Sequence, residues 1–169
     1  VLGDWHIPRL RAQLKLSDEY NIYKIPDGAT QLANMEPKTL AREKLGINHD
    51  GDLLLFLGIL RIDKGLEVLS EAVRKLLRSG ASFKLIVAGH PYDYSSQQIE
   101  NLFWADGQFK DRIRLDLNYV EDENLSKYYE SADALILPYN SKYKGSTGPL
   151  MKGACTYGLP LILSDQGEM

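Results

Sequence analysis

Disulfide bonds cannot form within this chain, because Cys155 is its only cysteine. A chain without disulfides is typical of an intracellular protein. Long apolar runs are also missing, since the longest, "LLLFLGIL" and "ALILP", are too short to cross a bilayer. The first residues, "VLGDWHIPRLRAQL", lack the basic start and apolar stretch of a signal peptide. These absences predict a cytoplasmic protein, and the lack of an initial Met predicts a fragment or a processed form.

An excess of positive charge is absent as well. The chain has 20 Lys and Arg against 23 Asp and Glu, a net charge of −3, and no block of like charge. A general nucleic-acid binder needs a basic face, so we expect no nucleic-acid partner. Hydrophobic residues make up 44% of the chain and charged residues 25%, as in ordinary globular domains. A chain of 169 residues is long enough for one domain with its own core.

Strand-like and helix-like segments alternate from residue 52 onward. Residues 52–59, "DLLLFLGI", form an apolar run of strand length, as expected for a strand buried on both faces. Apolar residues then recur at helical spacing up to Gly80, which predicts an amphipathic helix. Its apolar face is expected to hold Leu66, Leu69, Val73 and Leu76.

Four more strands and three more helices follow the same pattern. The strands are expected at 83–89, 112–120, 134–138 and 159–165, and the helices at 95–107, 121–134 and 149–158. Asp122 is the expected N-cap of the second of these helices. Five strands alternating with helices predict an α/β fold, a Rossmann-like doubly wound parallel sheet covered on both faces.

The ends of the chain differ from this regular part. Residues 1–51 are polar and rich in turns, with one short helix at "PKTLAREKLG", and we interpret them as a lead-in segment that packs on the domain of residues 52–169. The chain stops at "LSDQGEM", directly after a strand. Because a doubly wound sheet normally continues with another helix, we expect the domain to be truncated at its C-terminus.

Cations and glycines follow several of the expected strands. Ligands of open parallel sheets bind beyond the carboxyl ends of the strands, where these loops meet. Helix N-termini offer free N–H groups to an anion, and glycine lets the backbone approach it closely. We therefore predict a site for a phosphate group, most naturally a diphosphate. Its expected residues are Arg61, Lys64, Lys144, Ser146, Thr147, Gly148 and Leu150, and we expect Gly58, Gly65, Gly89 and His90 to complete the substrate-binding residues at this edge.

Each of these features also has a purely structural interpretation. The "GSTG" loop before a helix can serve only as a cap, and Arg61 and Lys64 can be solvated cations near Asp63. His6 and His49 lack any nearby pattern of metal ligands, so we expect no metal site. Cys155 lies among small residues and is interpreted as a buried small hydrophobe.

Four quoted segments occur in the order known from one enzyme family. They are "IPDGA", "LLLFLGILRIDKGLEVLSEAV", "YVEDENLSKYYESADALILPY" and "YGLPLILSD". In this order they resemble the C-terminal, donor-binding domain of retaining glycosyltransferases of the GT-B architecture, called glycosyl transferases group 1. The resemblance runs from about residue 21 to the end of the chain.

The resemblance implies a function and roles for individual residues. In the family, an Arg and a Lys after the first strand bind the diphosphate of a nucleotide-sugar donor. Lys64 matches that Lys; the usual Arg position holds Ile59, and Arg61 is similar to the Arg of a subgroup reading "G-x-I-R-x-Y-K-G". Gly89 matches a glycine near the base. No metal or cofactor is needed, because the nucleoside-diphosphate sugar is itself the substrate.

The remaining partners would bind outside this chain. A glycan or lipid-linked acceptor, and usually a catalytic histidine, belong to the family's N-terminal domain, so catalytic residues are unknown here and the chain alone should be inactive. Lipid-linked acceptors would place the full-length protein peripherally at the cytoplasmic membrane face. The base, sugar, acceptor and oligomeric state stay open.

One departure from the family pattern supports a competing hypothesis. Two family glutamates, eight positions apart, correspond to Gly145 and Gly153, and the second normally holds the donor ribose. The chain is therefore either a donor-binding domain of a subgroup without these glutamates or a catalytically silent interaction module. An unrelated dinucleotide-dependent reductase is disfavoured, because no "G-x-G-x-x-G" follows the first strand.

Overall fold

The structure is a computed structural model that describes residues 6–23, 28–30, 32, 34–105, 107–143 and 147–165. Its centre is a five-stranded sheet with the strand order β3-β2-β1-β4-β5, in which every pairing is parallel. The strands are β1 (Asp52–Leu57), β2 (Phe83–Ala88), β3 (Ile113–Asp116), β4 (Ala134–Leu137) and β5 (Leu161–Leu163). All five predicted strands are present, and the predicted Rossmann-like α/β fold is confirmed.

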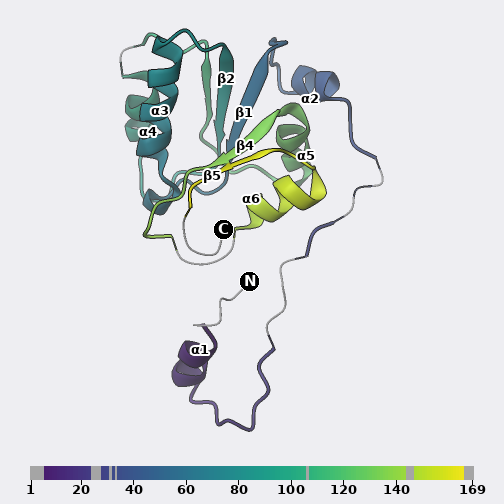
Figure 1. Cartoon of the computed structure of the whole chain (residues 1–169), viewed down its shortest axis with the longest axis vertical. Helices are drawn as coiled ribbons and strands as arrows, with labels where there is room; N and C mark the ends of the chain where they lie inside the picture. Colours follow the sequence, from purple (N-terminus) through teal and green to yellow (C-terminus); the bar gives the residue numbers. More distant parts are fainter. Residues whose placement is uncertain are drawn as a thin grey trace.

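Helices cover both faces of this sheet, as Figure 1 shows. On one side lie α3 (Leu66–Arg78) and α4 (Ser96–Trp104); on the other lie α2 (Lys38–Lys44), α5 (Asp122–Ser131) and α6 (Gly148–Met151). A short 3-10 turn, Ile62–Lys64, precedes α3, and a π-helical turn, Lys152–Thr156, follows α6. Of the lead-in segment, α2 packs against α5, whereas α1 (His6–Leu14) lies apart from the sheet in this view.

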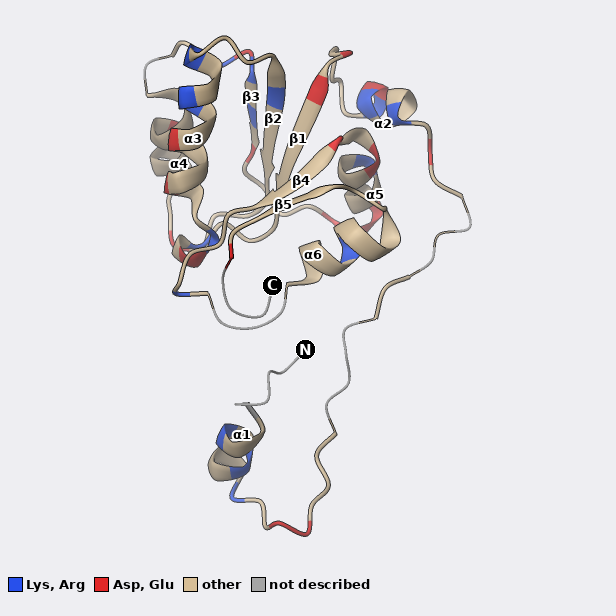
Figure 2. Cartoon of the chain, viewed as in Figure 1, with Lys and Arg blue, Asp and Glu red and all other residues tan. Residues whose placement is uncertain are grey.

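The core forms between the sheet and its helices. Leu53, Leu55 and Phe56 of β1 and Leu85 and Val87 of β2 are fully buried, as expected for central parallel strands covered on both faces. Acidic and basic residues lie on the helices on both sides of the sheet (Figure 2). Within the described ranges, no helix is both long and apolar enough to cross a membrane.

The predicted apolar face of α3 is wrong at one position. Leu66, Leu69 and Val73 are buried as expected, but Leu76 is 50% exposed and Leu77 is buried in its place. At about 100° per residue, Leu77 lies roughly above Leu66, whereas Leu76 is turned away by about 80°. The buried face of α3 therefore continues from Val73 to Leu77, four residues later, and the residue three positions after Val73 lies outside it.

Two other local predictions are also wrong. The N-cap of α5 is Glu121, and Asp122 is the first helical residue, without a side-chain cap hydrogen bond. Cys155 is exposed. Its exposure follows from Gly153, which faces the sheet, because two helical positions turn a side chain to roughly the opposite side.

Candidate functional site

A pocket of about 270 Å³ opens at the carboxyl ends of the strands. It is lined by Leu57, Gly58, Ile59, Gly89, His90, Tyr119, Val120, Asp122, Leu125, Tyr129, Gly148, Pro149 and Lys152. The segments that follow β1, β2 and β3 and the start of α6 therefore meet at one place, as the rule for open parallel sheets requires. Four residues predicted for the site are among those that line it: Gly58, Gly89, His90 and Gly148.

Glycines bring the first two strand ends together at this pocket. Gly89 has a φ of +144°, and a Cβ atom there would lie 1.9 Å from the carbonyl oxygen of Gly58. Gly58 in turn donates its N–H to the carbonyl of Ala88 at 3.0 Å. Because no side chain fits between these backbones, the pocket keeps open space beyond β1 and β2.

The turn of residues 61–65 packs against the segment that follows β4. Gly65 is left-handed, with a φ of +71°, and a Cβ there would lie 1.9 Å from the carbonyl oxygen of Pro138. Asn140 closes the contact: its backbone N–H donates to the carbonyl of Asp63 at 3.0 Å, and its side-chain amide donates to that of Ile62 at 2.6 Å. These contacts fix Lys64 beside the end of β4.

Lys64 is buried between two aromatic rings. Its side chain is 8% exposed, and its Nζ lies 3.7 Å from the ring centroid of Tyr139 and 4.0 Å from that of Tyr143. We call these two residues the tyrosine cage. Burial lowers the pKa of Lys64 to about 8, against the opposing effect of Asp63. No carboxylate of the described chain forms an ion pair with this ammonium group.

The tyrosine cage connects Lys64 to Thr147. The hydroxyl of Tyr139 and the Oγ1 of Thr147 form a buried hydrogen bond of 2.9 Å. Thr147 directly precedes Gly148, which lines the pocket. Two residues predicted for the site from distant parts of the sequence are therefore linked through Tyr139, which sequence reasoning had not singled out.

Arg61 is turned toward its neighbour Asp63. Its Nε lies 3.1 Å from Oδ1, and its Nη2 lies 2.5 Å from Oδ2. This hydrogen bond with Asp63 raises the pKa of Arg61, so the guanidinium is charged throughout the ordinary pH range. The proximity to Asp63 foreseen in the structural interpretation of Arg61 is thus present.

The other predicted residues lie around the pocket or outside the described chain. Arg61, Lys64, Gly65, Thr147 and Leu150 are not among the residues that line the pocket. Lys144, Gly145 and Ser146 lie outside the described residues. Sequence reasoning missed Tyr119, Asp122, Leu125, Tyr129 and Lys152. Tyr119 was missed because the third strand was expected to run to residue 120, whereas it ends at Asp116. For Tyr139, the available signal was its position directly after the fourth strand.

Gly153, the position of the second family glutamate, faces the sheet. A Cβ atom there would lie 2.6 Å from the Cδ2 of Leu135 and 3.6 Å from that of Leu161. Its neighbour Lys152 is exposed and lines the pocket. A side chain at 153 therefore points into the core in this structure, and the π-helical turn presents residue 152 to the pocket.

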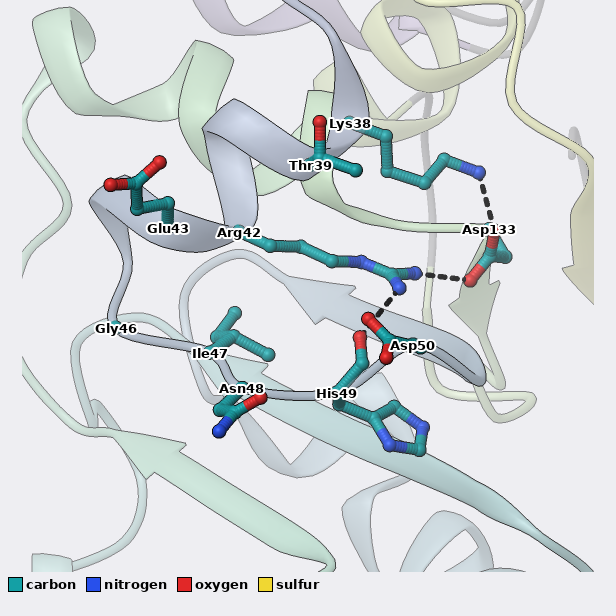
Figure 3. Close-up of a pocket in the computed structure, with 10 residues that line it drawn as sticks. All are labelled: Lys38, Thr39, Arg42, Glu43, Gly46, Ile47, Asn48, His49, Asp50 and Asp133. Atoms are coloured by element: carbon teal, nitrogen blue, oxygen red, sulfur yellow. Dashed lines mark hydrogen bonds and ion pairs between the residues drawn. The ribbon is translucent and has the colours of Figure 1, made fainter.

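A larger cavity, of about 720 Å³, lies at the opposite edge of the sheet, beside α2 (Figure 3). Three of its charged side chains, those of Lys38, Arg42 and Asp133, hold α2 to the sheet. Arg42 donates to the backbone carbonyls of Ser131, His49 and Gly51 and to the carboxylate of Asp133, which also pairs with Lys38. We therefore assign this cavity a structural role. In the described part of the chain, no three His, Cys, Asp or Glu residues are grouped as metal ligands.

Comparisons with known proteins agree with the fold and with the motifs. The family described as glycosyl transferases group 1 matches residues 37–169. An uncharacterized glycosyltransferase from Methanocaldococcus jannaschii, MJ1607, is 31% identical over 135 residues, which cover 79% of this chain and 32% of the relative. A D-inositol 3-phosphate glycosyltransferase from Frankia alni is 30% identical over 135 residues, covering 76% and 32%.

A solved structure shows the same fold at lower identity. Sucrose-phosphate synthase from Thermosynechococcus elongatus superposes with a TM-score of 0.66 at 22% identity, over 95% of this chain and 39% of that one. The fold is thus that of a Rossmann-like domain of a GT-B glycosyltransferase. The chain belongs to the glycosyl transferases group 1 family. It spans about a third of the length of the curated relatives that it matches.

Proposed function

We propose that this chain is the donor-binding domain of a retaining glycosyltransferase, which transfers a sugar from a nucleoside-diphosphate sugar to a glycan or lipid-linked acceptor. The observation that carries the proposal is the buried ammonium of Lys64, which is linked through Tyr139 to Thr147 at the edge of the pocket. A buried cation without a carboxylate partner is costly unless an anion neutralises it. A diphosphate at the carboxyl edge of the sheet would supply that anion.

Each part of the donor has a chemically suitable neighbour. The pocket, with Leu57, Val120 and Leu125 in its wall, offers apolar surface to a base and its ribose. Lys64 offers three N–H donors to phosphate oxygens, and α3 begins at Leu66, just beyond it. When the bond between the sugar and the diphosphate breaks, a fixed cation stabilises the leaving nucleoside diphosphate. This chemistry requires no metal or cofactor.

Acceptor binding and the remaining catalysis are assigned to another domain of the full-length protein. The chain covers about a third of its curated relatives, so it offers only part of the surface that two substrates need. The chain alone is therefore expected to bind the donor without turning it over. Peripheral association with the cytoplasmic membrane face would accompany a lipid-linked acceptor.

A second candidate function is a catalytically silent interaction module of the same family. It is favoured by Gly153, because this position lacks the family glutamate and its side chain would point into the core. Sugar transfer by the full-length protein would exclude this candidate. Nucleotide binding without any transfer by the full-length protein would favour it.

Calorimetric titration with UDP, GDP and ADP, each against its own nucleoside, tests the leading proposal. At least one nucleotide should bind, and its nucleoside should bind more weakly because it lacks the diphosphate. Lys64→Ala should weaken nucleotide binding by about 1.5–3 kcal/mol, the range for a hydrogen bond to a charged group. Lys75→Ala removes an exposed lysine of α3 and serves as the matched control, with binding unchanged. Absence of binding by all three nucleotides at millimolar concentration contradicts the proposal.

A further inference from the structure

The surroundings of Lys64 contain aromatic faces where a buried lysine ordinarily meets a carboxylate. The ammonium lies 3.7 and 4.0 Å from the two ring centroids, well within the range of a cation–π contact. Its nearest charged neighbours in the sequence, Arg61 and Asp63, are paired with each other. The rings attract the charge but accept no strong hydrogen bond, so the N–H donors of Lys64 stay available to an anion.

The two rings are themselves fixed in place. Tyr139 is 1% exposed, and its ring packs on that of Tyr143 at 4.5 Å between centroids with a tilt of 55°. The hydroxyl of Tyr139 is bonded to Thr147, and its backbone carbonyl accepts a hydrogen bond from the hydroxyl of Ser164, just after β5. Tyr139 therefore joins the turn after β1, the start of α6 and the end of β5.

We propose that Tyr139 and Tyr143 are positioning residues for donor binding: their rings hold the Lys64 ammonium in place, and the Tyr139 hydroxyl fixes it relative to Thr147. This inference rests on the proposed donor-binding function and adds to it the residues that orient the cation. Neither tyrosine lines the pocket, so both act through Lys64 and not by touching the base.

The same arrangement makes donor affinity depend on pH. Burial brings the pKa of Lys64 to about 8, while Asp63 raises it and Arg61 lowers it. Tyr139, whose ring faces the ammonium, is neutral here, because burial raises its pKa above the usual value. Lys64 therefore loses its charge as the pH rises through about 8, and nucleotide binding should weaken over that interval.

A double-mutant cycle separates positioning from mere packing. Tyr139→Leu removes one ring, and Lys64→Met removes the ammonium while keeping an unbranched side chain. With Lys64 present, Tyr139→Leu should weaken binding of the best of UDP, GDP and ADP by about 5- to 30-fold, as expected for a desolvated cation–π contact. In the Lys64→Met background the same change should cost less than about twofold, because its effect passes through the ammonium. Equal losses in both backgrounds would overturn the proposal.

Two milder variants keep the test decisive if Tyr139→Leu does not fold. Tyr143→Leu removes the less buried ring and should show the same dependence on Lys64. Tyr139→Phe keeps the ring and loses the bond to Thr147, so it should weaken nucleotide binding by only about two- to fivefold. It should also leave the pH at which binding weakens unchanged. A full loss of binding in Tyr139→Phe, or additive losses for Tyr143→Leu and Lys64→Met, contradicts the cage.

A measurement without ligand distinguishes failure of the cage from failure of the proposed function. The Nζ and Cε signals of Lys64, assigned by their absence in Lys64→Met, are titrated by NMR between about pH 6 and pH 11. A midpoint near 8 is expected in the unmodified chain and in Tyr139→Phe, and a higher one in Tyr143→Leu, because the ammonium becomes solvated. An ordinary midpoint in the unmodified chain overturns the cage, even where a nucleotide binds. A midpoint near 8 without any nucleotide binding overturns the donor function, and with it the role of the cage in donor binding.

Discussion

A Cβ atom on Gly65 would lie 1.9 Å from the carbonyl oxygen of Pro138. The turn that carries Lys64 thus touches, backbone to backbone, the segment that carries the tyrosine cage. The contact also explains how a short turn holds a buried lysine, since its glycine, its carbonyls and Asn140 are all engaged. Substitutions at Gly65 and at Lys64 test this arrangement.

Gly65→Ala should destabilise the domain by about 2–4 kcal/mol, since a left-handed alanine costs about 1–2 kcal/mol and the clash with a backbone oxygen adds to it. Gly46→Ala is the matched control: its φ of +66° is similar, but nothing lies within 4 Å of its Cβ position. Gly46→Ala should lose only the stability that a left-handed alanine costs, because no clash is added there. Urea unfolding curves measure both losses, and equal values for the two variants would show that the close approach to Pro138 is absent.

Lys64→Met should stabilise the chain near pH 7 by about 1–3 kcal/mol, because each unit of lowered pKa is worth about 1.4 kcal/mol. The pKa of Lys64 is about 8 in the folded chain, against 10.5 for an ordinary lysine. Between these values the unfolded chain binds more protons, so the stability contributed by this position rises with pH. The difference in the free energy of unfolding between Lys64→Met and the parent should therefore become smaller as the pH rises from about 8 to 10.5.

Thermal or urea unfolding at several pH values provides the measurement for this change. Lys75→Met is the control on the exposed face of α3 and should change stability by less than about 0.5 kcal/mol. A Lys64→Met variant that is less stable than the parent near neutral pH would count against the burial of an unpaired ammonium. Gained stability together with lost nucleotide binding is the expected signature of a functional site.

The fold was largely predictable because its signals are local. An apolar run of strand length predicts a buried parallel strand from adjacent residues alone, and residues 83–89 contain β2, Phe83–Ala88. The turn glycines were recognisable as well, since Gly58 and Gly89 each directly follow an apolar run of strand length. The choice of Leu76 over Leu77 failed although the sequence held the answer, because a helical rotation of about 100° per residue places Leu77, and not Leu76, above Leu66.

The site was predictable only in part, because its chemistry arises from tertiary contacts. Lys64 and Thr147 could be placed at one edge by the rule for parallel sheets. The tyrosine cage could not be predicted, since three strands and three helices lie between Lys64 and Tyr139 in the sequence and no spacing rule connects the two residues. The direction of the residue 153 side chain likewise depends on the π-helical turn, which no pattern in the sequence predicted.

Asp133→Asn should weaken the attachment of α2 to the sheet. Burial alone would raise the pKa of Asp133, but hydrogen bonds from Lys38 and the Leu53 backbone, with the charge of Arg42, lower it overall. Because the pKa of Asp133 is lowered in the folded chain, its carboxylate stabilises the fold at pH values above the ordinary pKa of Asp. This stabilisation is lost as the pH falls through the lowered pKa of the folded chain. Near pH 7 the variant should lose about 1–3 kcal/mol, and the difference should shrink in acid.

Unfolding by urea at neutral and acidic pH checks this expectation. Asp111→Asn removes an exposed carboxylate and should change stability by less than about 0.5 kcal/mol. If Asp133→Asn were as stable as Asp111→Asn near pH 7, or if its deficit grew in acid, the lowered pKa would be refuted.

Gly153→Glu and Lys152→Glu should differ in their effects on stability, although the two positions are adjacent. At 153 the new side chain meets Leu135, so a carboxylate would be forced toward the core, and we expect a loss of about 2–4 kcal/mol in stability. At 152 the side chain is exposed and lines the pocket, so stability should change by less than about 0.5 kcal/mol. Nucleotide binding should nevertheless weaken in Lys152→Glu, because a negative charge replaces a positive one near the proposed diphosphate site.

Urea unfolding and nucleotide titration of both variants distinguish the two possible orientations of this helix. A glutamate at 153 that is tolerated and strengthens nucleotide binding would mean that the position faces the pocket. The observed distance of 2.6 Å between the Cβ position of residue 153 and Leu135 argues for the opposite. A glutamate at 153 would therefore lie against Leu135 and away from the pocket, which Lys152 lines.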